Sequence, residues 1–220
     1  EILPAPFVVA HLQIGLTLRN LGAPLSHETE ERAGVYLTNA LTGWEPPDET
    51  KRSLPFPEFE EEAEAADRVK REVPILVVLG NPPYNGWAGV AIGEERELSD
   101  AYRETDQAPK PEGHGLNDLY VRFFRMAERR IVEMTHRGVV SYISNYNWLD
   151  RQSFPGMRER YLNAFDEIRI DNLHGDKYRT GKTTPSGASD PSVFSTAESP
   201  VGIQVGTAIA TLVHMGGASS

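Results

Sequence analysis

The chain has 220 residues, a formal net charge of −10 and no cysteine. This length suits one domain with a single core, and the lack of cysteine excludes disulfides and thiolate metal sites. No apolar run is long enough to span a bilayer and no signal peptide is recognisable, so we expect no membrane partner.

The acidic charge is unevenly distributed along the chain. Residues 122–182 hold 12 of the 22 Lys and Arg but only 8 of the 32 Asp and Glu, so this part is +4 and the remainder is −14. The second half could therefore face phosphates, which need Lys and Arg contacts. The alternative, favoured for most of Arg122, Arg125, Arg129 and Arg130, is a solvated helix face.

The first third of the chain predicts two helices separated by a short strand and a proline-rich connection. Pro4 to Leu21 carries apolar residues at helical spacing, and Glu58 to Arg71 is a charged, alanine-containing segment typical of an exposed helix. Between them, Val35 to Leu37 is a short strand candidate. Residues 43–57 contain four prolines and predict an irregular connection.

Residues 75–84 are the most informative segment of the sequence. The apolar run Ile75 to Leu79 is typical of a strand buried on both faces of a parallel sheet. It ends at Gly80, and Asn81-Pro82-Pro83-Tyr84 follows. Because proline lacks an N–H and restricts the residue before it, this segment predicts a stiff turn. Open α/β sheets bind ligands at such carboxyl ends of strands.

The turn brings together groups that can orient a planar amine. The Asn81 carboxamide oxygen and a backbone carbonyl can each accept one amine hydrogen, which aims the nitrogen lone pair at an electrophile. The Tyr84 ring can stack on the flat group that carries the amine. The required electrophile is a methyl sulfonium, which implies S-adenosylmethionine. The structural alternative is a turn in which Asn81 caps its own backbone and Tyr84 packs sideways.

The middle of the chain predicts a lid and a long helix. The polar stretch from Gly86 to Gly113 has no clear periodicity, and we interpret it as a lid over the substrate. Leu116 to His136 is the clearest helix, with Asn117 as its cap. Its expected buried stripe consists of Leu119, Phe123, Met126, Ile131 and Met134.

The last third predicts three strands and one more helix. Val139 to Ile143 is a buried strand followed by the polar and aromatic loop Ser144 to Trp148. Phe154 to Phe165 reads as a helix, and Glu167 to Leu173 and Ile203 to His214 read as strands. Strands that alternate with helices predict an α/β fold with a mostly parallel sheet.

Asn-Pro-Pro-Tyr after a strand resembles the fourth motif of the amino-methyltransferases. More narrowly, the sequence resembles the adenine-N6 DNA methyltransferase segment of type ISP and type IIG restriction–modification enzymes, over most of its length. The resemblance implies a Rossmann-like sheet, mostly parallel, with an antiparallel strand near one edge. Residues 1–220 would form a single partial catalytic domain whose N-terminal part, with the first cofactor motif, lies outside the sequence.

The resemblance also implies roles for particular residues. Glu1 would accept hydrogen bonds from the cofactor ribose, and Thr38 and Asn39 would read its adenine, although relatives commonly have Asp at position 39. Asn81 would contact both cofactor and target amine, and Phe194 would pack on the extruded base. The loop from His174 to Lys177, followed by Arg179 and Lys182, is either a contact to the DNA backbone or a mobile loop.

The implied function is transfer of a methyl group from S-adenosylmethionine to a flipped adenine in double-stranded DNA. Other amines remain open as targets: cytosine N4, guanine N2 in RNA, or a protein glutamine. A third possibility is an inactive fragment that only binds DNA or has a structural role. We expect a cytoplasmic, prokaryotic protein within a larger polypeptide that carries nuclease or translocase and target-recognition domains. No metal-ligating cluster or phosphate-binding glycine loop is present in the sequence.

Overall fold

The computed structural model describes residues 3–26, 28–29, 31–44, 57–84 and 93–217. The chain divides into two compact units, Glu1–Val73 and Pro74–Ser220, and each unit is described by itself. That both belong to one domain of a longer polypeptide stays a prediction. No helix among the described residues combines the length and the apolar character that crossing a membrane requires.

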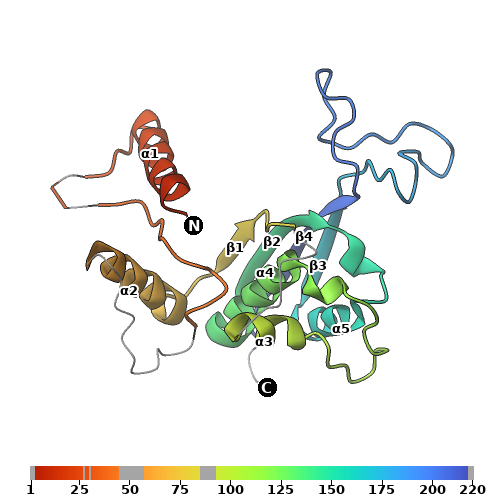
Figure 1. Ribbon diagram of the computed structural model, residues 1–220, viewed down its shortest axis with the longest axis horizontal. Coiled ribbons are helices and arrows are strands. Elements are labelled where there is room, and N and C mark those ends of the chain that lie inside the picture. The colour runs from red at the N-terminus through yellow and green to blue at the C-terminus, as the bar shows by residue number, and fades with distance from the viewer. Residues whose placement is uncertain (1–2, 27, 30, 45–56, 85–92, 218–220) are drawn as a thin grey trace. The chain divides into compact units, whose positions relative to one another are not determined.

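The first unit contains the two predicted helices but not the predicted strand. Helix α1 spans Pro4–Asn20 and helix α2 spans Pro57–Glu72 (Figure 1). Pro4 lies in the first turn of α1, where its missing N–H costs nothing. Residues 35–37 are not a strand, so that prediction is wrong. A strand needs a partner for its backbone groups, and the described part of this unit contains no other strand.

The second unit is built on a four-stranded sheet with the order β1-β2-β4-β3. The strands are β1 (Val77–Gly80), β2 (Gly138–Asn145), β3 (Glu167–Asn172) and β4 (Thr207–His214). Strands β1 and β2 pair in parallel, whereas β4 is antiparallel to both of its neighbours. The expectation of a mostly parallel sheet is therefore wrong and the sheet is mixed, although the antiparallel strand does lie next to one edge.

Helices connect these strands in the order that the sequence predicted, with one addition. Helix α4 spans Leu119–Glu128 and leads into β2, and α5 spans Pro155–Ala164 and leads into β3 (Figure 1). Helix α3, Glu94–Asp100, was not predicted and lies within the segment interpreted as a lid. Residues 85–92 of that segment lie outside the described residues, so the lid stays a prediction.

The core lies on one face of the sheet, between the strands and the helices. Residues that alternate along β2 and β4 point into it, among them Val140, Tyr142, Ala210 and Leu212. The side chains between them in sequence point to the opposite face, where Ser141 and Thr211 bring their hydroxyl oxygens within 3.2 Å of each other. This alternation is the two-residue period of a strand.

Phe124 of α4 lies at the centre of the core. Its ring centroid lies 5.1 Å from that of Tyr142, 5.7 Å from that of Trp148 and 6.1 Å from those of Tyr120 and Tyr161. The contact with Tyr142 is edge-to-face, which is the favoured geometry for aromatic pairs. One side chain thus links α4, α5 and β2.

The long helix differs from its prediction in register and in form. Its buried hydrophobic residues are Tyr120, Val121, Phe124, Ala127 and Ile131, so only one member of the predicted stripe is buried. After Glu128 the helix continues as a π-helix, Arg129–Thr135. The wider turn rotates the following residues relative to an α-helix, which a pattern of period 3.6 does not capture. The predicted cap is also displaced, because the N-cap residue is Asp118 rather than Asn117.

The arginines of this helix do not form a solvated face, so that interpretation is wrong for three of the four. Arg122, Arg125 and Arg130 are buried. Arg122 pairs with Glu95 at 3.0 Å, and Arg125 lies 3.1 Å from the buried carboxylate of Glu128. The charges of Arg122 and Arg125 are therefore paired with carboxylates inside the unit.

Strand β1 is less buried than its sequence predicts. Val78 packs against the core, but Val77 and Leu79 on the opposite face are 55% and 74% exposed. The prediction of a strand buried on both faces is therefore wrong for the described residues. The described residues cover only the face of β1 that carries Val78.

Replacing Phe124 by Ala tests the central role of this ring. We expect the free energy of unfolding to fall by about 3–5 kcal/mol, because the cavity opens among four packed aromatic rings. Urea unfolding followed by tryptophan fluorescence measures the change. Leu162→Ala on α5 is the matched control, since Leu162 is 73% exposed and its loss should cost less than about 0.5 kcal/mol.

Candidate functional site

The Asn-Pro-Pro-Tyr turn lies at the carboxyl end of β1, as predicted. The parallel ladder to β2 ends with the pair Gly80 and Tyr142, and neither proline that follows could extend it. Pro82 is buried whereas Asn81 and Tyr84 are exposed. The turn is thus anchored by one proline and presents the amide and the aromatic ring at the surface of the second unit.

The Tyr84 hydroxyl connects the turn to the neighbouring strand. It lies 3.0 Å from Oδ1 of Asn81 and 3.1 Å from the backbone oxygen of Ile143 in β2. Both oxygens are acceptors, so the hydroxyl is the donor in each contact. The alternative in which Asn81 caps its own backbone does not describe this arrangement, because the carboxamide oxygen accepts from a side chain.

The amino-terminal end of α4 contributes further groups to the same edge of the sheet. Tyr120 lies beside Tyr84, with ring centroids 6.4 Å apart at an angle of 60°. Burial raises the pKa of the Tyr84 phenol, and the nearby Asp118 carboxylate raises it further. Burial likewise raises the pKa of Tyr120, with Asp118 and Tyr84 acting in the same direction. Both phenols therefore stay protonated, and that of Tyr84 acts as a donor.

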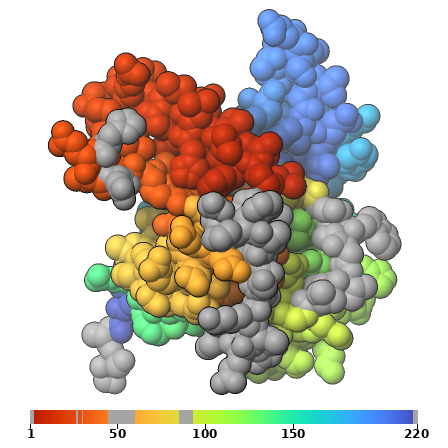
Figure 2. Space-filling view, turned by 60° about the vertical axis from the view of Figure 1, so that its left-hand side comes forward, coloured from red at the N-terminus to blue at the C-terminus, as the bar shows by residue number. Residues whose placement is uncertain are grey.

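The loop after β2 is held by the long connection between β3 and β4, residues 173–206, which extends beyond the strand ends (Figures 1 and 2). The Tyr146 hydroxyl donates to Oδ2 of Asp176 at 2.5 Å. Arg179 donates to both carboxylate oxygens of Asp150, at 2.6 and 2.9 Å, and its guanidinium lies 5.1 Å from the centre of the Tyr146 ring. A Cβ on Gly206 would lie 2.0 Å from the Tyr146 ring, so only glycine fits there.

The hydrogen bond between Tyr146 and Asp176, together with burial, explains the ionisation state of both side chains. Burial raises the pKa of Tyr146 to about 12, and the hydrogen bond to Asp176 adds to the effect. Burial alone would raise the pKa of Asp176, but hydrogen bonds from Tyr146 and from the backbone N–H groups of Arg179 and Tyr178 outweigh it and lower the pKa. Asp176 is an ionised carboxylate with a structural role. Contact of this loop with DNA stays a prediction.

Phe194 lies in the same connection and is 40% exposed. Among the described residues its ring makes no contact with Tyr84, so its expected role in packing on a base stays a prediction. His174 lies 2.9 Å from the Asp190 carboxylate, and Lys182 donates to the backbone oxygen of Val201. These groups brace the connection internally.

The residues expected to hold the cofactor adenine belong to the first unit. Thr38 and Asn39 surround the buried ammonium group of Lys70, which lies 2.7 Å from the Thr38 hydroxyl and 2.9 Å from the Asn39 backbone oxygen. Oδ1 of Asn39 accepts from the backbone N–H of Leu41 at 3.0 Å. Both residues hold their own loop together, and their expected contact with the cofactor adenine stays a prediction. Glu1 lies outside the described residues.

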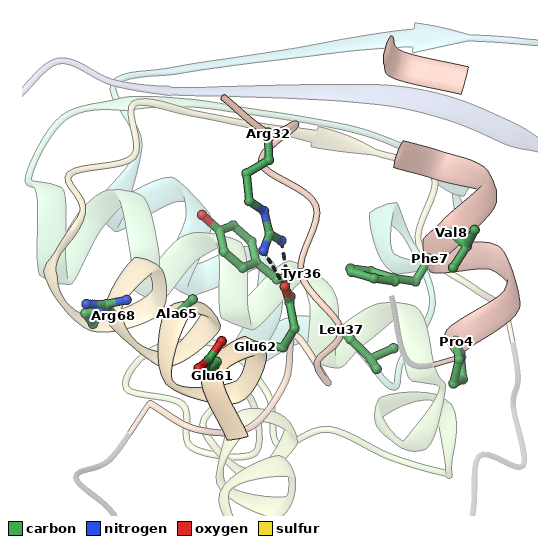
Figure 3. Close-up of a pocket in the computed structure, with 10 residues that line it drawn as sticks. All are labelled: Pro4, Phe7, Val8, Arg32, Tyr36, Leu37, Glu61, Glu62, Ala65 and Arg68. Carbon is green, nitrogen blue, oxygen red and sulfur yellow. Dashed lines mark hydrogen bonds and ion pairs between the residues drawn. The ribbon is translucent and has the colours of Figure 1, made fainter. Parts of the chain in front are cut away.

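A separate hollow of about 600 Å³ lies within the first unit, between α1, residues 32–37 and α2 (Figure 3). Arg32 pairs with Glu62 across it and lies 5.3 Å from the centre of the Tyr36 ring. The hydrogen bond to Arg32 lowers the pKa of Glu62. The charges of Arg32 and Glu62 are thus paired with each other.

Three groups of the site were not among the residues selected from sequence: Asp118, Tyr120 and the backbone oxygen of Ile143. The sequence did contain a signal for Asp118 and Tyr120. The helix that follows a strand in a parallel βαβ unit begins at the carboxyl edge of the sheet, so the first turn of the predicted helix belongs beside Asn81. The Ile143 carbonyl carries no sequence signal.

Comparison with known proteins places the fold. No protein-family model and no curated protein matches the chain, but several solved structures do. The ATP-dependent Type ISP restriction-modification enzyme LlaBIII bound to DNA has a TM-score of 0.70 and 23% identity. A nuclease-deletion mutant of the Type ISP enzyme LlaGI, in complex with a DNA substrate mimic, has a TM-score of 0.69 and 24% identity. The DrdV–DNA complex has a TM-score of 0.65 and 24% identity.

The match covers nearly all of this chain and a small part of each neighbour. It includes 99%, 99% and 97% of the present residues, and 14%, 17% and 20% of the LlaBIII, LlaGI and DrdV chains. At these identities the likeness establishes a shared fold. The activity of the neighbours is carried over only as a proposal.

Replacing Asp176 by Asn tests whether this carboxylate holds the site loop. We expect the free energy of unfolding at pH 7 to fall by about 1.5–3 kcal/mol, because hydrogen bonds to a charged acceptor are lost. The folded pKa lies below the unfolded value of about 3.9. The stabilisation is therefore complete above that value and disappears as the pH falls through the folded pKa.

Urea unfolding of both proteins at pH 7 and at successively lower pH measures this difference. The two curves should converge in acid. A constant difference at all pH values would show that the substitution acts through packing rather than through the charge. The exposed Asp171→Asn in β3 is the control, and it should stay close to the parent protein throughout.

Proposed function

We propose that this chain is the amine-binding part of a DNA adenine-N6 methyltransferase in a restriction–modification enzyme. The target would be an adenine extruded from the duplex. The observation that carries the proposal is the exposed Asn81 carboxamide oxygen, held at the end of a strand by two prolines and hydrogen-bonded by a phenol. This oxygen sits where an N–H donor can reach it.

The geometry suits an exocyclic amine better than a charged or purely apolar ligand. Oδ1 of Asn81 and the backbone oxygen of Ile143 both lie within hydrogen-bond distance of one point, the Tyr84 hydroxyl oxygen. A nitrogen at a similar point could donate one hydrogen to each acceptor. Its lone pair would then be directed away from both. Fixed dipoles that orient a weak nucleophile need no general base at the moment of transfer.

The fold comparisons support a role on DNA. The matched structures are restriction–modification enzymes or complexes with DNA. The sheet is mixed rather than mostly parallel, but the antiparallel strand beside one edge is the one feature of the arrangement implied by the motif resemblance that the described residues contain. The substrate, the partners and a place in a larger prokaryotic, cytoplasmic polypeptide with nuclease or translocase and target-recognition domains are part of the same proposal.

The proposed cofactor is S-adenosylmethionine, which would supply an electrophilic methyl group. The described residues fit the acceptor side of the reaction. In the structure Thr38 and Asn39 are engaged within their own loop, and their role in holding the cofactor stays a prediction. We therefore derive only the part played by the second unit, which is to bind and orient the amine.

The nature of the methylated base tests the proposal directly. The natural polypeptide that contains this chain is incubated with duplex DNA and S-adenosylmethionine, and the nucleosides are analysed by mass spectrometry. We expect N6-methyladenine, and sequencing of the product then maps the modified site. N4-methylcytosine alone would reject adenine as the target, and no methylated nucleoside at all would reject the proposed function.

Asn81→Ala tests the residue that carries the proposal. We expect methyl transfer to fall by at least about 100-fold, as for the loss of one preorganised catalytic dipole, while the affinity for S-adenosylmethionine changes little. Single-turnover kinetics and a calorimetric titration measure the two quantities. Asn163→Ala in α5 is the matched control, because Asn163 is exposed and lies at the end of a helix rather than at the turn. Retained turnover in the Asn81 variant would count against the assigned role.

A further inference from the structure

The proposed function uses the ring of Tyr84 and leaves its hydroxyl unassigned. We infer that this hydroxyl occupies the position of the target amine in the substrate-free site, so that binding exchanges one hydrogen-bond donor for another. The inference rests on the proposed function and assigns Tyr84 a second role, in substrate selection.

The two contacts of the hydroxyl carry the inference. Its oxygen lies 3.0 Å from Oδ1 of Asn81 and 3.1 Å from the backbone oxygen of Ile143. One acceptor lies in the turn after β1 and the other in β2, and a phenol has only one proton to share between them. An amino group has two hydrogens and could satisfy both acceptors together. The site is therefore better matched to an NH₂ group than to the hydroxyl that fills it.

The phenol remains a donor throughout the physiological range. Burial raises its pKa, and the Asp118 carboxylate raises it further. A phenolate at this place would face the oxygens of Asn81 and Ile143 with no proton between them. The protonated form thus prevails, and it imitates the N–H donor of a substrate.

Tyr84 is also free enough to leave this position. The residue is 47% exposed, and its ring is tilted by 60° against Tyr120 rather than stacked on it. By contrast, the hydroxyls of Tyr102 and Tyr161 are fully buried and lie 3.1 Å apart in the core. Rotation of Tyr84 breaks two neutral hydrogen bonds and moves a side chain that is already about half exposed. In the proposed exchange, this rotation turns the ring toward an incoming base.

The exchange has a consequence for selectivity. A base with an exocyclic amine replaces the donor that it displaces, so the acceptors on Asn81 and Ile143 stay paired. A base without such an amine, such as thymine, would break the Tyr84 contacts and leave these acceptors without a donor. Unpaired polar groups cost more than the average hydrogen bond contributes.

Tyr84→Phe tests the inference, because it removes the hydroxyl and keeps the ring. We expect the KM for duplex DNA that carries the mapped site to fall roughly two- to tenfold, the equivalent of one neutral hydrogen bond, with kcat changed by less than about twofold. Steady-state kinetics with the natural polypeptide measure both constants. The control is Asn163→Ala, since Asn163 is exposed and lies at the end of α5 rather than at the turn.

Tyr84→Leu separates the hydroxyl from the ring. This variant also releases the acceptors, but it loses stacking worth roughly 1–3 kcal/mol per base, which corresponds to about 5- to 150-fold. We therefore expect KM to rise, opposite in sign to Tyr84→Phe. Thermal unfolding should show both variants folded at the assay temperature.

The possible results separate the inference from the proposed function. A lower KM in Tyr84→Phe with an unchanged kcat supports the exchange. An unchanged or higher KM, or a kcat that falls with KM constant, overturns it and makes the hydroxyl a support of the turn. If Asn81→Ala retains full turnover, the proposed function itself fails. If only Asn81→Ala behaves as expected, the proposed function stands without the exchange.

Discussion

The end of the parallel ladder at Gly80 is the constraint on which the candidate site depends. Strand β1 pairs with β2 as far as Tyr142, and Pro82 and Pro83 cannot donate the bonds that would continue the pairing. The carbonyl of Ile143 is therefore left facing the turn, and the Tyr84 hydroxyl takes the place of the missing backbone donor. The same break in the ladder releases Asn81 from the sheet. One interruption of regular structure thus supplies both acceptors of the proposed amine site.

The core keeps this edge in place from one side of the sheet. Phe124 packs against Tyr142 of β2 and against Tyr120 of the same helix, and Tyr120 in turn contacts Tyr84. The aromatic contacts therefore run without interruption from the centre of the core to the surface of the site. A helix that begins at the carboxyl edge of the sheet also brings Asp118 there, where its charge adds to the effect of burial in raising the pKa of both phenols. Stability and site geometry are set by the same helix.

The sequence predicted those parts of the fold that follow from local patterns. Helices α1, α2 and α5, strands β1 to β4 along the chain and the turn at Asn81 all have short-range signals, and each lies close to its expected residues. Local patterns missed the properties that depend on distant partners, and only the family resemblance implied an antiparallel strand near one edge. The direction of β4 depends on its pairing, the buried face of α4 depends on a π-helical turn, and the burial of Arg122 depends on Glu95. The roles of Glu1, Thr38, Asn39 and Phe194 came from resemblance alone and stay predictions.

The two sides of the candidate site differ in how firmly they are held. The loop after β2 is fixed by a charged acceptor, because Asp176 binds Tyr146 and two backbone N–H groups, and Arg179 binds Asp150 through two nitrogens. Tyr84 is held by neutral hydrogen bonds at an exposed position. Charge-assisted bonds are roughly twice as strong as neutral ones. A ligand that binds at this edge therefore contacts a firmly held loop after β2 and a Tyr84 ring that can move. Exchange of the Tyr84 hydroxyl for a substrate amine at Asn81 requires this combination.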